Sequence, residues 1–137
     1  FLVQGLLPAL QAAASEADPA RVINIGSIYA VTTEVSLAYS YTASKAAIHQ
    51  LTRVLARELA PRRILVNAIA PGLFHTKMTD FAMKHEEVRT RMLQAVPLGR
   101  SGTVEDIGGL ALFLSSRAGA YVNGSIIPLY GGILAAH

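Results

Sequence analysis

The sequence of 137 residues contains no cysteine, and only 15% of its residues are charged. Without cysteine the chain has neither a disulfide nor a thiolate metal site, which agrees with a cytoplasmic protein. Its apolar runs are too short and too often interrupted to span a membrane. The net charge of +3 is scattered, and Arg62-Arg63 is the single basic doublet, so nucleic acid is not an expected partner.

Hydrophobic residues, by contrast, make up 52% of the chain, which suits one domain whose sheet is covered on both faces. The first 15 residues begin with Phe, are largely apolar and end in small residues, as in both signal peptides and amphipathic helices. The segment has no basic residue, and Gln4 and Pro8 interrupt it, which favours a truncated amphipathic helix. The apolar side of this helix is predicted to carry Leu2, Leu6, Leu7, Leu10 and Ala13.

Apolar segments of strand length alternate with segments of helical period along the rest of the chain. Strands are predicted at 21–25, 64–70 and 125–130, helices at 38–60, 79–95 and after Thr103, and a loop at 28–37. Strands that alternate with helices form a parallel sheet with right-handed crossovers. The expected fold is therefore α/β, and Pro128, which has no N–H, suits an edge strand.

Residue spacing within the helices predicts which side chains are buried. The apolar face of the 38–60 helix is predicted to comprise Ala47, Ile48, Leu51, Val54, Leu55 and Leu59, with His49, Gln50, Arg53 and Arg57 pointing away. Thr103 and Asp106 have the spacing of a capping box, and Gly108-Gly109 predicts close packing of the last helix. Three histidines without partners at metal-ligand spacing are predicted on the surface: His49, His85 and His137. His75 is predicted in an exposed loop, with contact to a substrate as the alternative.

Tyr41 and Lys45 are four residues apart, so on a helix their Cβ atoms lie roughly 5–6 Å from each other on one face. An unperturbed tyrosine titrates near ~10, and a fixed ammonium group nearby favours the phenolate, which suits acid–base catalysis. Tyr29 and Tyr39 have Thr33 and Ala43 at the same spacing and lack such a partner. Tyr41 is therefore the candidate proton donor.

Ser27 follows the predicted strand at 21–25, at the edge where parallel sheets bind ligands. Together with Tyr41 and Lys45 it can hold a carbonyl oxygen, supply a proton and tune the proton donor. Tyr-x-x-x-Lys alone also fits a surface tyrosine and lysine on an ordinary helix. Ser36 and Ser40 are rival serines, although neither lies at a strand end.

This combination resembles the short-chain dehydrogenase/reductase family, whose signature is Tyr-x-x-x-Lys with a preceding serine. Other segments match the family in the same order: Ile25-Gly26-Ser27 at a strand end, 66–72 with Thr76 as its Asn-x-x-x-Pro-Gly-x-x-x-Thr stretch, Pro97-Leu98-Gly99-Arg100 after its substrate lid, and Gly131-Gly132 at its C-terminal turn. Within the family, residues 38–41 and 47–51 look most like the 3-oxoacyl reductases linked to rhamnolipid synthesis.

The resemblance implies an NAD(P)-dependent oxidoreductase, leaning toward NADP(H), that interconverts a carbonyl and an alcohol on a doubly wound, Rossmann-like sheet. By position, Ser27, Tyr41 and Lys45 would be catalytic. The cofactor would contact Tyr41, Lys45, Pro71, Gly72, Phe74 and Thr76, and the substrate Ser27, Ile28 and Phe74. No metal site is expected. Residues 76–100 would form a lid, whose soft apolar side chains suit a hydrophobic substrate. The first helix and the 38–60 helix each carry more apolar surface than one side of a sheet needs, and in the resembled family these two helices pair across a twofold axis. A homodimer or homotetramer is therefore expected.

The sequence departs from the family pattern at three places. Ser27 precedes Tyr41 by fourteen residues, one more than is usual, and Tyr130 stands where Asp is common before Gly-Gly. The G-x-x-x-G-x-G phosphate loop, a residue that reads the adenosine ribose, and an Asn-Asn-Ala-Gly segment are all absent. These belong to the first half of the family's domain, so residues 1–137 are expected to be the C-terminal part of a single NAD(P)-binding domain.

Two other functions remain open. A nucleotide-sugar epimerase or dehydratase also uses Tyr-x-x-x-Lys, but usually carries a larger substrate segment than the 92 residues that follow Lys45. A truncated, non-catalytic structural or binding relative is the other alternative, because the phosphate loop is absent.

Overall fold

Helices and strands alternate as predicted in the computed structural model, which describes residues 2–33 and 39–136. The elements are α1 (Leu2–Ala13), β1 (Ala20–Ile25), α2 (Tyr39–Leu59), β2 (Ile64–Pro71), α3 (Asp80–Lys84), α4 (Glu86–Gln94), α5 (Val104–Ser115) and β3 (Ile126–Leu129). Short 3₁₀ turns occur at Ile28–Ala30, Ala60–Arg62, Arg117–Gly119 and Ile133–Ala136. None of the described helices is long and apolar enough to cross a membrane.

The described strands form one parallel sheet in the order β1-β2-β3. Ala20 of β1 lies opposite Ile64, and Ala68 of β2 lies opposite Ile126. Residues 66–70 of the central strand β2 are all buried, as an apolar run predicts for a strand covered on both faces. Pro128 lies in the edge strand β3, where its missing N–H costs no ladder bond. The predicted α/β fold is confirmed.

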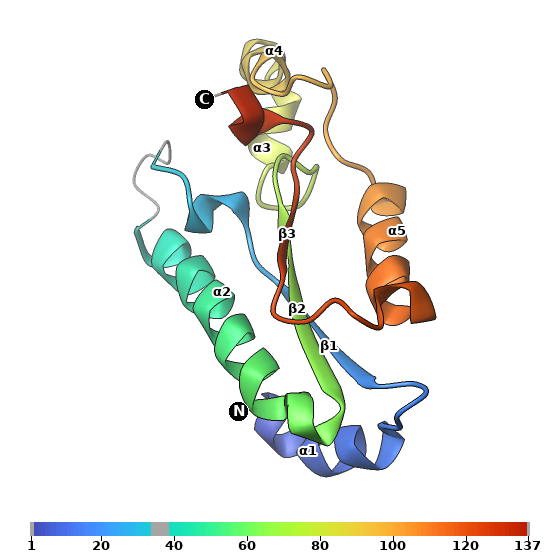
Figure 1. The fold of residues 1–137 in the computed structure, drawn as a ribbon. Helices are drawn as coiled ribbons and strands as arrows, with labels where there is room; N and C mark the ends of the chain where they lie inside the picture. The colour runs from blue at the N-terminus through green and yellow to red at the C-terminus, as the bar shows by residue number, and fades with distance from the viewer. Residues whose placement is uncertain (1, 34–38, 137) are drawn as a thin grey trace.

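Helices cover both faces of this sheet. Figure 1 shows α2 and α5 on opposite sides of the strands, with α1 close to the carboxyl end of α2. The apolar core between α1, α2 and the sheet is built on Ala56, Leu59, Ile64 and Val66. The carboxyl ends of the strands point the other way, toward α3 and α4 (Figure 1). This cluster lies toward the amino ends of β1 and β2, away from their carboxyl ends.

α1 packs through a stripe that shares only Leu7 and Leu10 with the predicted side, so the prediction is confirmed in part. The core contacts come from residues at i, i+4, i+7 and i+11: Val3, Leu7, Leu10 and Ala14. Leu2, Leu6 and Ala13 of the predicted side are exposed. The helix carries two adjacent apolar stripes, and helical period alone does not decide which one faces the sheet.

The buried face of α2 also differs from the prediction. Leu51 and Val54, predicted in the core, are 46% and 48% exposed, whereas His49, predicted on the surface, is 3% exposed. The buried residues are His49, Thr52, Ala56 and Leu59, of which Leu59 was predicted, and the predicted Leu55 packs against the core. Polar side chains are buried here because β1 offers them partners: the Asn24 side-chain amide donates to Thr52 Oγ1 at 2.9 Å.

The predicted helix at 79–95 is broken into α3 and α4. His85 between them has an extended backbone (φ −92°, ψ 111°). Glu86 and Glu87 then open α4, where their charges complement the helix dipole, and Arg89 pairs with Glu86 at 2.8 Å. None of the residues of α3 and α4 is buried, and His85 is exposed as predicted.

α5 begins with the predicted capping box. Thr103 Oγ1 accepts from the Asp106 N–H at 3.4 Å, and Asp106 Oδ2 accepts from the Thr103 N–H at 2.8 Å. The close packing predicted from Gly108-Gly109 is wrong within the described part of the chain, because a Cβ at either position would meet nothing within 4 Å.

Candidate active site

The carboxyl ends of β1 and β2 open into a cavity of about 660 Å³, bounded also by the first turns of α2 and by α5. It is lined by all the residues predicted as catalytic, cofactor-binding or substrate-binding: Ser27, Ile28, Tyr41, Lys45, Pro71, Gly72, Phe74 and Thr76. Parallel sheets bind ligands beyond the carboxyl ends of their strands, which explains why residues far apart in sequence meet here. The structure brings these residues together, and their individual roles stay predictions.

Ser27 follows the last residue of β1 by two positions and is buried. Its Oγ accepts from the Tyr29 N–H at 3.2 Å, so the serine caps the 3₁₀ turn at Ile28–Ala30. The described start of the predicted 28–37 loop is therefore a helical turn. Residues 34–38, which include the rival Ser36, lie outside the described chain. Ser40, the other rival, is exposed in the first turn of α2 and is not among the residues that line the cavity.

Tyr41 and Lys45 share one face of α2, as predicted. Lys45 Nζ lies 5.6 Å from the centre of the Tyr41 ring. The same ammonium donates to the main-chain oxygen of Ile25 at 2.9 Å, which ties α2 to the end of β1. A positive charge thus stands beside the phenol, next to the strand end that carries Ser27.

Tyr29 is a cavity residue that the sequence analysis did not select. Its ring lies edge-on to the Tyr41 ring, with centroids 6.3 Å apart and an interplanar angle of 77°. Such T-shaped pairs are favoured by the ring quadrupoles. Tyr29 was set aside because it lacks a lysine partner, although its place two residues after a strand-end serine is a signal for proximity to the site.

His49 packs behind Ser27 from the next turn of α2 after Lys45. Its Nε2 accepts from the Ser27 N–H at 3.4 Å, and its Nδ1 has no hydrogen-bond partner among the described residues. Burial, with smaller effects from the charges of Arg53 and Lys45, lowers the pKa of His49 below its ordinary value. The imidazole is therefore neutral at neutral pH, and accepting at Nε2 places its proton on Nδ1. The sequence predicted a surface histidine because no metal ligand stood nearby, and hydrogen bonding to the backbone was not considered.

The chain after β2 forms the opposite side of the cavity. The Gly72 N–H donates to the Leu129 carbonyl at 2.9 Å, and a Cβ on Gly72 would lie 2.7 Å from that of Tyr130. Only glycine fits this close approach of two chain segments. Phe74 forms an isolated parallel bridge with Gly102, where an added Cβ would meet the phenyl ring at 2.3 Å. These contacts fix residues 72–74 against Leu129 at one end and Gly102 at the other.

His75 lies in an exposed loop, as predicted, and also lines the cavity. It contacts Asp80 at 3.2 Å, and Asp80 in turn pairs with Lys84 at 2.5 Å. The hydrogen bonds from Lys84 and then His75 hold the pKa of Asp80 below its ordinary value. Thr76 is exposed, and its N–H donates to Thr79 Oγ1 at 2.9 Å. No three metal-ligating side chains gather anywhere in residues 2–33 and 39–136.

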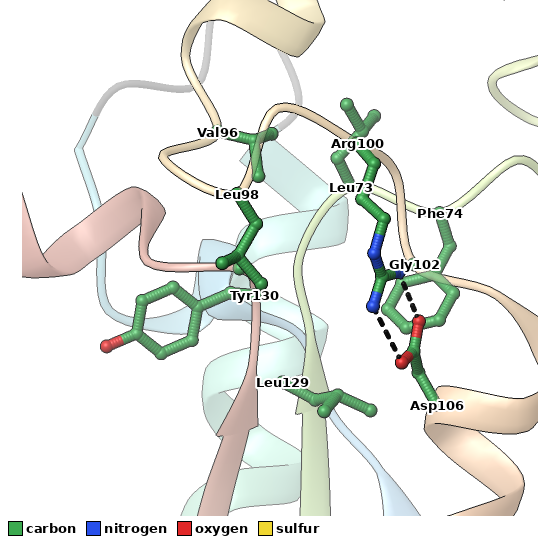
Figure 2. Close-up of a pocket in the computed structure, with 10 residues that line it drawn as sticks. Leu73, Phe74, Val96, Leu98, Arg100, Gly102, Asp106, Leu129 and Tyr130 are labelled. Carbon is green, nitrogen blue, oxygen red and sulfur yellow. Dashed lines mark hydrogen bonds and ion pairs between the residues drawn. The ribbon is translucent and has the colours of Figure 1, made fainter.

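An ion pair joins Arg100, the last residue of the 76–100 segment, to Asp106 of α5. Figure 2 shows Arg100 forking onto Asp106, with Nη1–Oδ2 and Nη2–Oδ1 distances of 2.6 and 3.0 Å. Arg100 and the Thr103 N–H hold the pKa of Asp106 well below its usual range. The pair lies beside a small cavity of about 60 Å³, whose lining includes Leu73, Leu98 and Leu129. It links the chain after α4 directly to the first turn of α5.

The C-terminal turn at Gly131 and Gly132 contacts Val96 and Leu98, near the end of residues 76–100. Gly131 and Gly132 have φ values of 61° and 92°, which only glycine adopts readily. A Cβ on Gly131 would lie 2.6 Å from Val96, and the Leu98 N–H donates to the Gly131 carbonyl at 3.1 Å. Residues 76–100 are therefore fixed at both ends, while α3 and α4 between those ends contain no buried residue.

Comparisons with known proteins agree with this arrangement. A family model described as "Enoyl-(Acyl carrier protein) reductase" matches residues 2–133. The chain is 45% identical over 130 residues to the rhamnolipids biosynthesis 3-oxoacyl-(acyl-carrier-protein) reductase of Pseudomonas aeruginosa, which covers 95% of this chain and 51% of that protein. It is 40% identical over 113 residues to the 3-oxoacyl-(acyl-carrier-protein) reductase FabG of Aquifex aeolicus, which covers 82% and 44%.

A solved structure leads to the same family. The Pseudomonas aeruginosa RhlG/NADP active-site complex superposes with a TM-score of 0.92 at 44% identity, over 96% of this chain and 51% of that one. The chain thus spans about half the length of the relatives it matches. The resemblance predicted from Ser27, Tyr41 and Lys45 is confirmed, and the chain belongs to the short-chain dehydrogenase/reductase family.

Proposed function

We propose that the protein carrying this chain is an NAD(P)-dependent oxidoreductase that interconverts a carbonyl and an alcohol. The convergence of Ser27, Tyr41 and Lys45 on one cavity at the carboxyl edge of the sheet carries this proposal. NADP(H) is the favoured cofactor, because the solved complex of the Pseudomonas aeruginosa relative contains NADP. The epimerase and non-catalytic alternatives have no comparable observation in their favour.

The donor set of the cavity fits a nicotinamide nucleotide. The Lys45 ammonium stands at the cavity wall and can donate to ribose hydroxyls, while the 71–76 segment can hold the carboxamide. When bound, the cofactor supplies the hydride. The chain's own side chains do the rest: Ser27 Oγ holds the carbonyl oxygen, Tyr41 passes the proton to it, and the charge of Lys45 favours the phenolate that this leaves.

Residues 1–137 are proposed to be the C-terminal part of one NAD(P)-binding domain. Within the described chain, β1 pairs with β2 on one side only, and its residues are half-buried or exposed, unlike those of β2. A hydrophobic strand with an open edge is a site for pairing or aggregation. A further strand along β1 would cover that edge and continue the parallel sheet.

Residues 76–100 are proposed to act as a substrate lid. Met78 and Met92 from this segment line the cavity, and Met78 and Phe81 are largely exposed. Flexible methionines adapt to irregular apolar ligands. With both ends of the segment fixed, α3 and α4 can move over the cavity, and the substrate is proposed to be hydrophobic.

A homodimer or homotetramer is proposed because α2 exposes a stripe of apolar side chains that a second copy of the chain would cover. The stripe comprises Ala43, Ala47, Leu51 and Val54. Size-exclusion chromatography with light scattering of the complete protein is expected to give at least twice the monomer mass. Leu51→Arg is expected to shift that mass toward the monomer, because it buries a charge between paired helices. A monomer in the unmodified protein would contradict the proposal.

The function is tested by assaying the complete protein with a 3-oxoacyl thioester and either NADPH or NADH. We expect consumption of NADPH with one alcohol formed per cofactor oxidised, and slower consumption of NADH. Residues 1–137 alone are the control and are expected to be inactive. Conversion of a nucleotide sugar without net oxidation of the cofactor would favour the epimerase reading, and absence of cofactor binding by the complete protein would favour the non-catalytic relative.

A further inference from the structure

The buried imidazole of His49 takes no part in the chemistry proposed above, yet it contacts the turn that carries Ser27. We propose that His49 is a positioning residue: its hydrogen bond to the Ser27 N–H fixes the serine relative to Tyr41 and Lys45 on the same helix. This inference rests on the proposed function, because it assigns His49 a part in holding the site for that reaction.

The end of β1 is held residue by residue. Lys45 Nζ donates to the Ile25 carbonyl at 2.9 Å, the Gly26 N–H donates to the Ile69 carbonyl at 2.7 Å, and the Ser27 N–H donates to His49 Nε2 at 3.4 Å. Two of these three contacts come from α2. Because Tyr41, Lys45 and His49 are spaced four residues apart, one face of the helix carries the phenol and both contacts to the strand end.

Gly26 and His49 have complementary shapes. A Cβ built on Gly26 would lie 2.2 Å from His49 Nε2 and 2.6 Å from its Cδ2. The imidazole therefore rests directly against the main chain between Ile25 and Ser27, and only glycine leaves room for it there. A contact this close sets the distance between α2 and the serine turn.

The burial of His49 also points to a purpose beyond packing. Its Nδ1 is buried with no partner among the described residues, and buried polar atoms are nearly always hydrogen-bonded. A leucine would fill the same space without an unpaired polar atom, but it would leave the Ser27 N–H without its acceptor. Burial and the charges of Arg53 and Lys45 keep the ring neutral, which leaves Nε2 free to accept.

The test compares His49→Leu, His49→Gln and Thr52→Val in the complete protein. Glutamine places an amide oxygen close to the position of Nε2 and can accept from Ser27, whereas leucine cannot. Thr52→Val is the matched control: Thr52 is buried one turn further along α2 and accepts from Asn24 of β1, without contacting Ser27. Thr52→Val therefore removes a bond from α2 to β1 and leaves the contact of α2 with the serine turn in place.

We expect His49→Leu to lower kcat by about tenfold or more through misplacement of the serine, with the Kd for NADPH changed by less than about twofold. His49→Gln should recover most of the rate, and Thr52→Val should keep kcat while lowering the melting temperature. Unchanged kcat in His49→Leu, or an equal loss in Thr52→Val, would overturn the proposal.

Amide hydrogen exchange separates this inference from the proposed function. In His49→Leu the Ser27 amide should exchange faster than in the unmodified protein, and in His49→Gln it should stay protected. Unmodified protein that lacks turnover would refute the proposed function and the positioning role with it, even if the exchange pattern is as expected. Turnover with unchanged Ser27 exchange in His49→Leu would refute the positioning role alone.

Discussion

Replacing Tyr41 by phenylalanine is expected to lower kcat of the complete protein by about 10²–10⁴, the usual contribution of a positioned acid–base group. The substitution removes only the hydroxyl that passes the proton. The ring itself remains, so its T-shaped contact with Tyr29 is kept. The fold and cofactor binding should therefore be preserved, and the loss should appear in kcat.

Tyr39→Phe is the matched control for this experiment. Tyr39 begins the same helix two residues earlier, is 77% exposed and does not line the cavity. Steady-state kinetics should show Tyr39→Phe within about twofold of the unmodified protein, as for most surface substitutions. If Tyr41→Phe also stays within a few fold, Tyr41 is not the proton donor.

The parts of the site that depend on local spacing were predictable from the sequence. Tyr41 and Lys45 share a helix face because the α-helical period places i and i+4 together, and Ser27 lies at the sheet edge because a run of apolar residues ends just before it. The capping box of Thr103 and Asp106 is likewise a local pattern. In each case the chemistry of neighbouring residues decides the structure.

The burial of polar side chains on α2 was not predictable in this way. His49 is buried because the Ser27 N–H, 22 residues away, donates to it, and Thr52 because Asn24, 28 residues away, does so. Helical period favoured Leu51 and Val54 for the core, and nothing local shows that β1 offers a hydrogen-bond partner to the adjacent stripe. Long-range hydrogen bonding thus overrides hydrophobic period at the part of the helix that borders the site.

The break between α3 and α4 was not predictable from the helical period, which runs through His85. The backbone of His85 is extended (φ −92°, ψ 111°), and no glycine or proline marks the break in the sequence. Tyr29 was missed for a different reason: it was judged only as a proton donor, whereas the structure uses its ring beside Tyr41.

Lys45→Met is expected to weaken NADPH binding and to lower kcat as well. Methionine keeps most of the apolar stem of the lysine and removes the ammonium. That group stands 5.6 Å from the Tyr41 ring centre and donates to the Ile25 carbonyl. Losing a charged hydrogen bond to the ribose costs about 1.5–3 kcal/mol, or roughly ten- to 150-fold in Kd. The rate should fall further, because the phenolate of Tyr41 loses its neighbouring charge.

Fluorescence titration with NADPH measures the first effect, and kcat at saturating cofactor measures the second. Lys84→Met is the matched control, because it removes a lysine charge that pairs with Asp80 and does not line the cavity. Both quantities should stay within about twofold in that variant. An unchanged Kd in Lys45→Met would show that the lysine does not contact the ribose, and a fall in kcat alone would then restrict its role to the charge beside Tyr41.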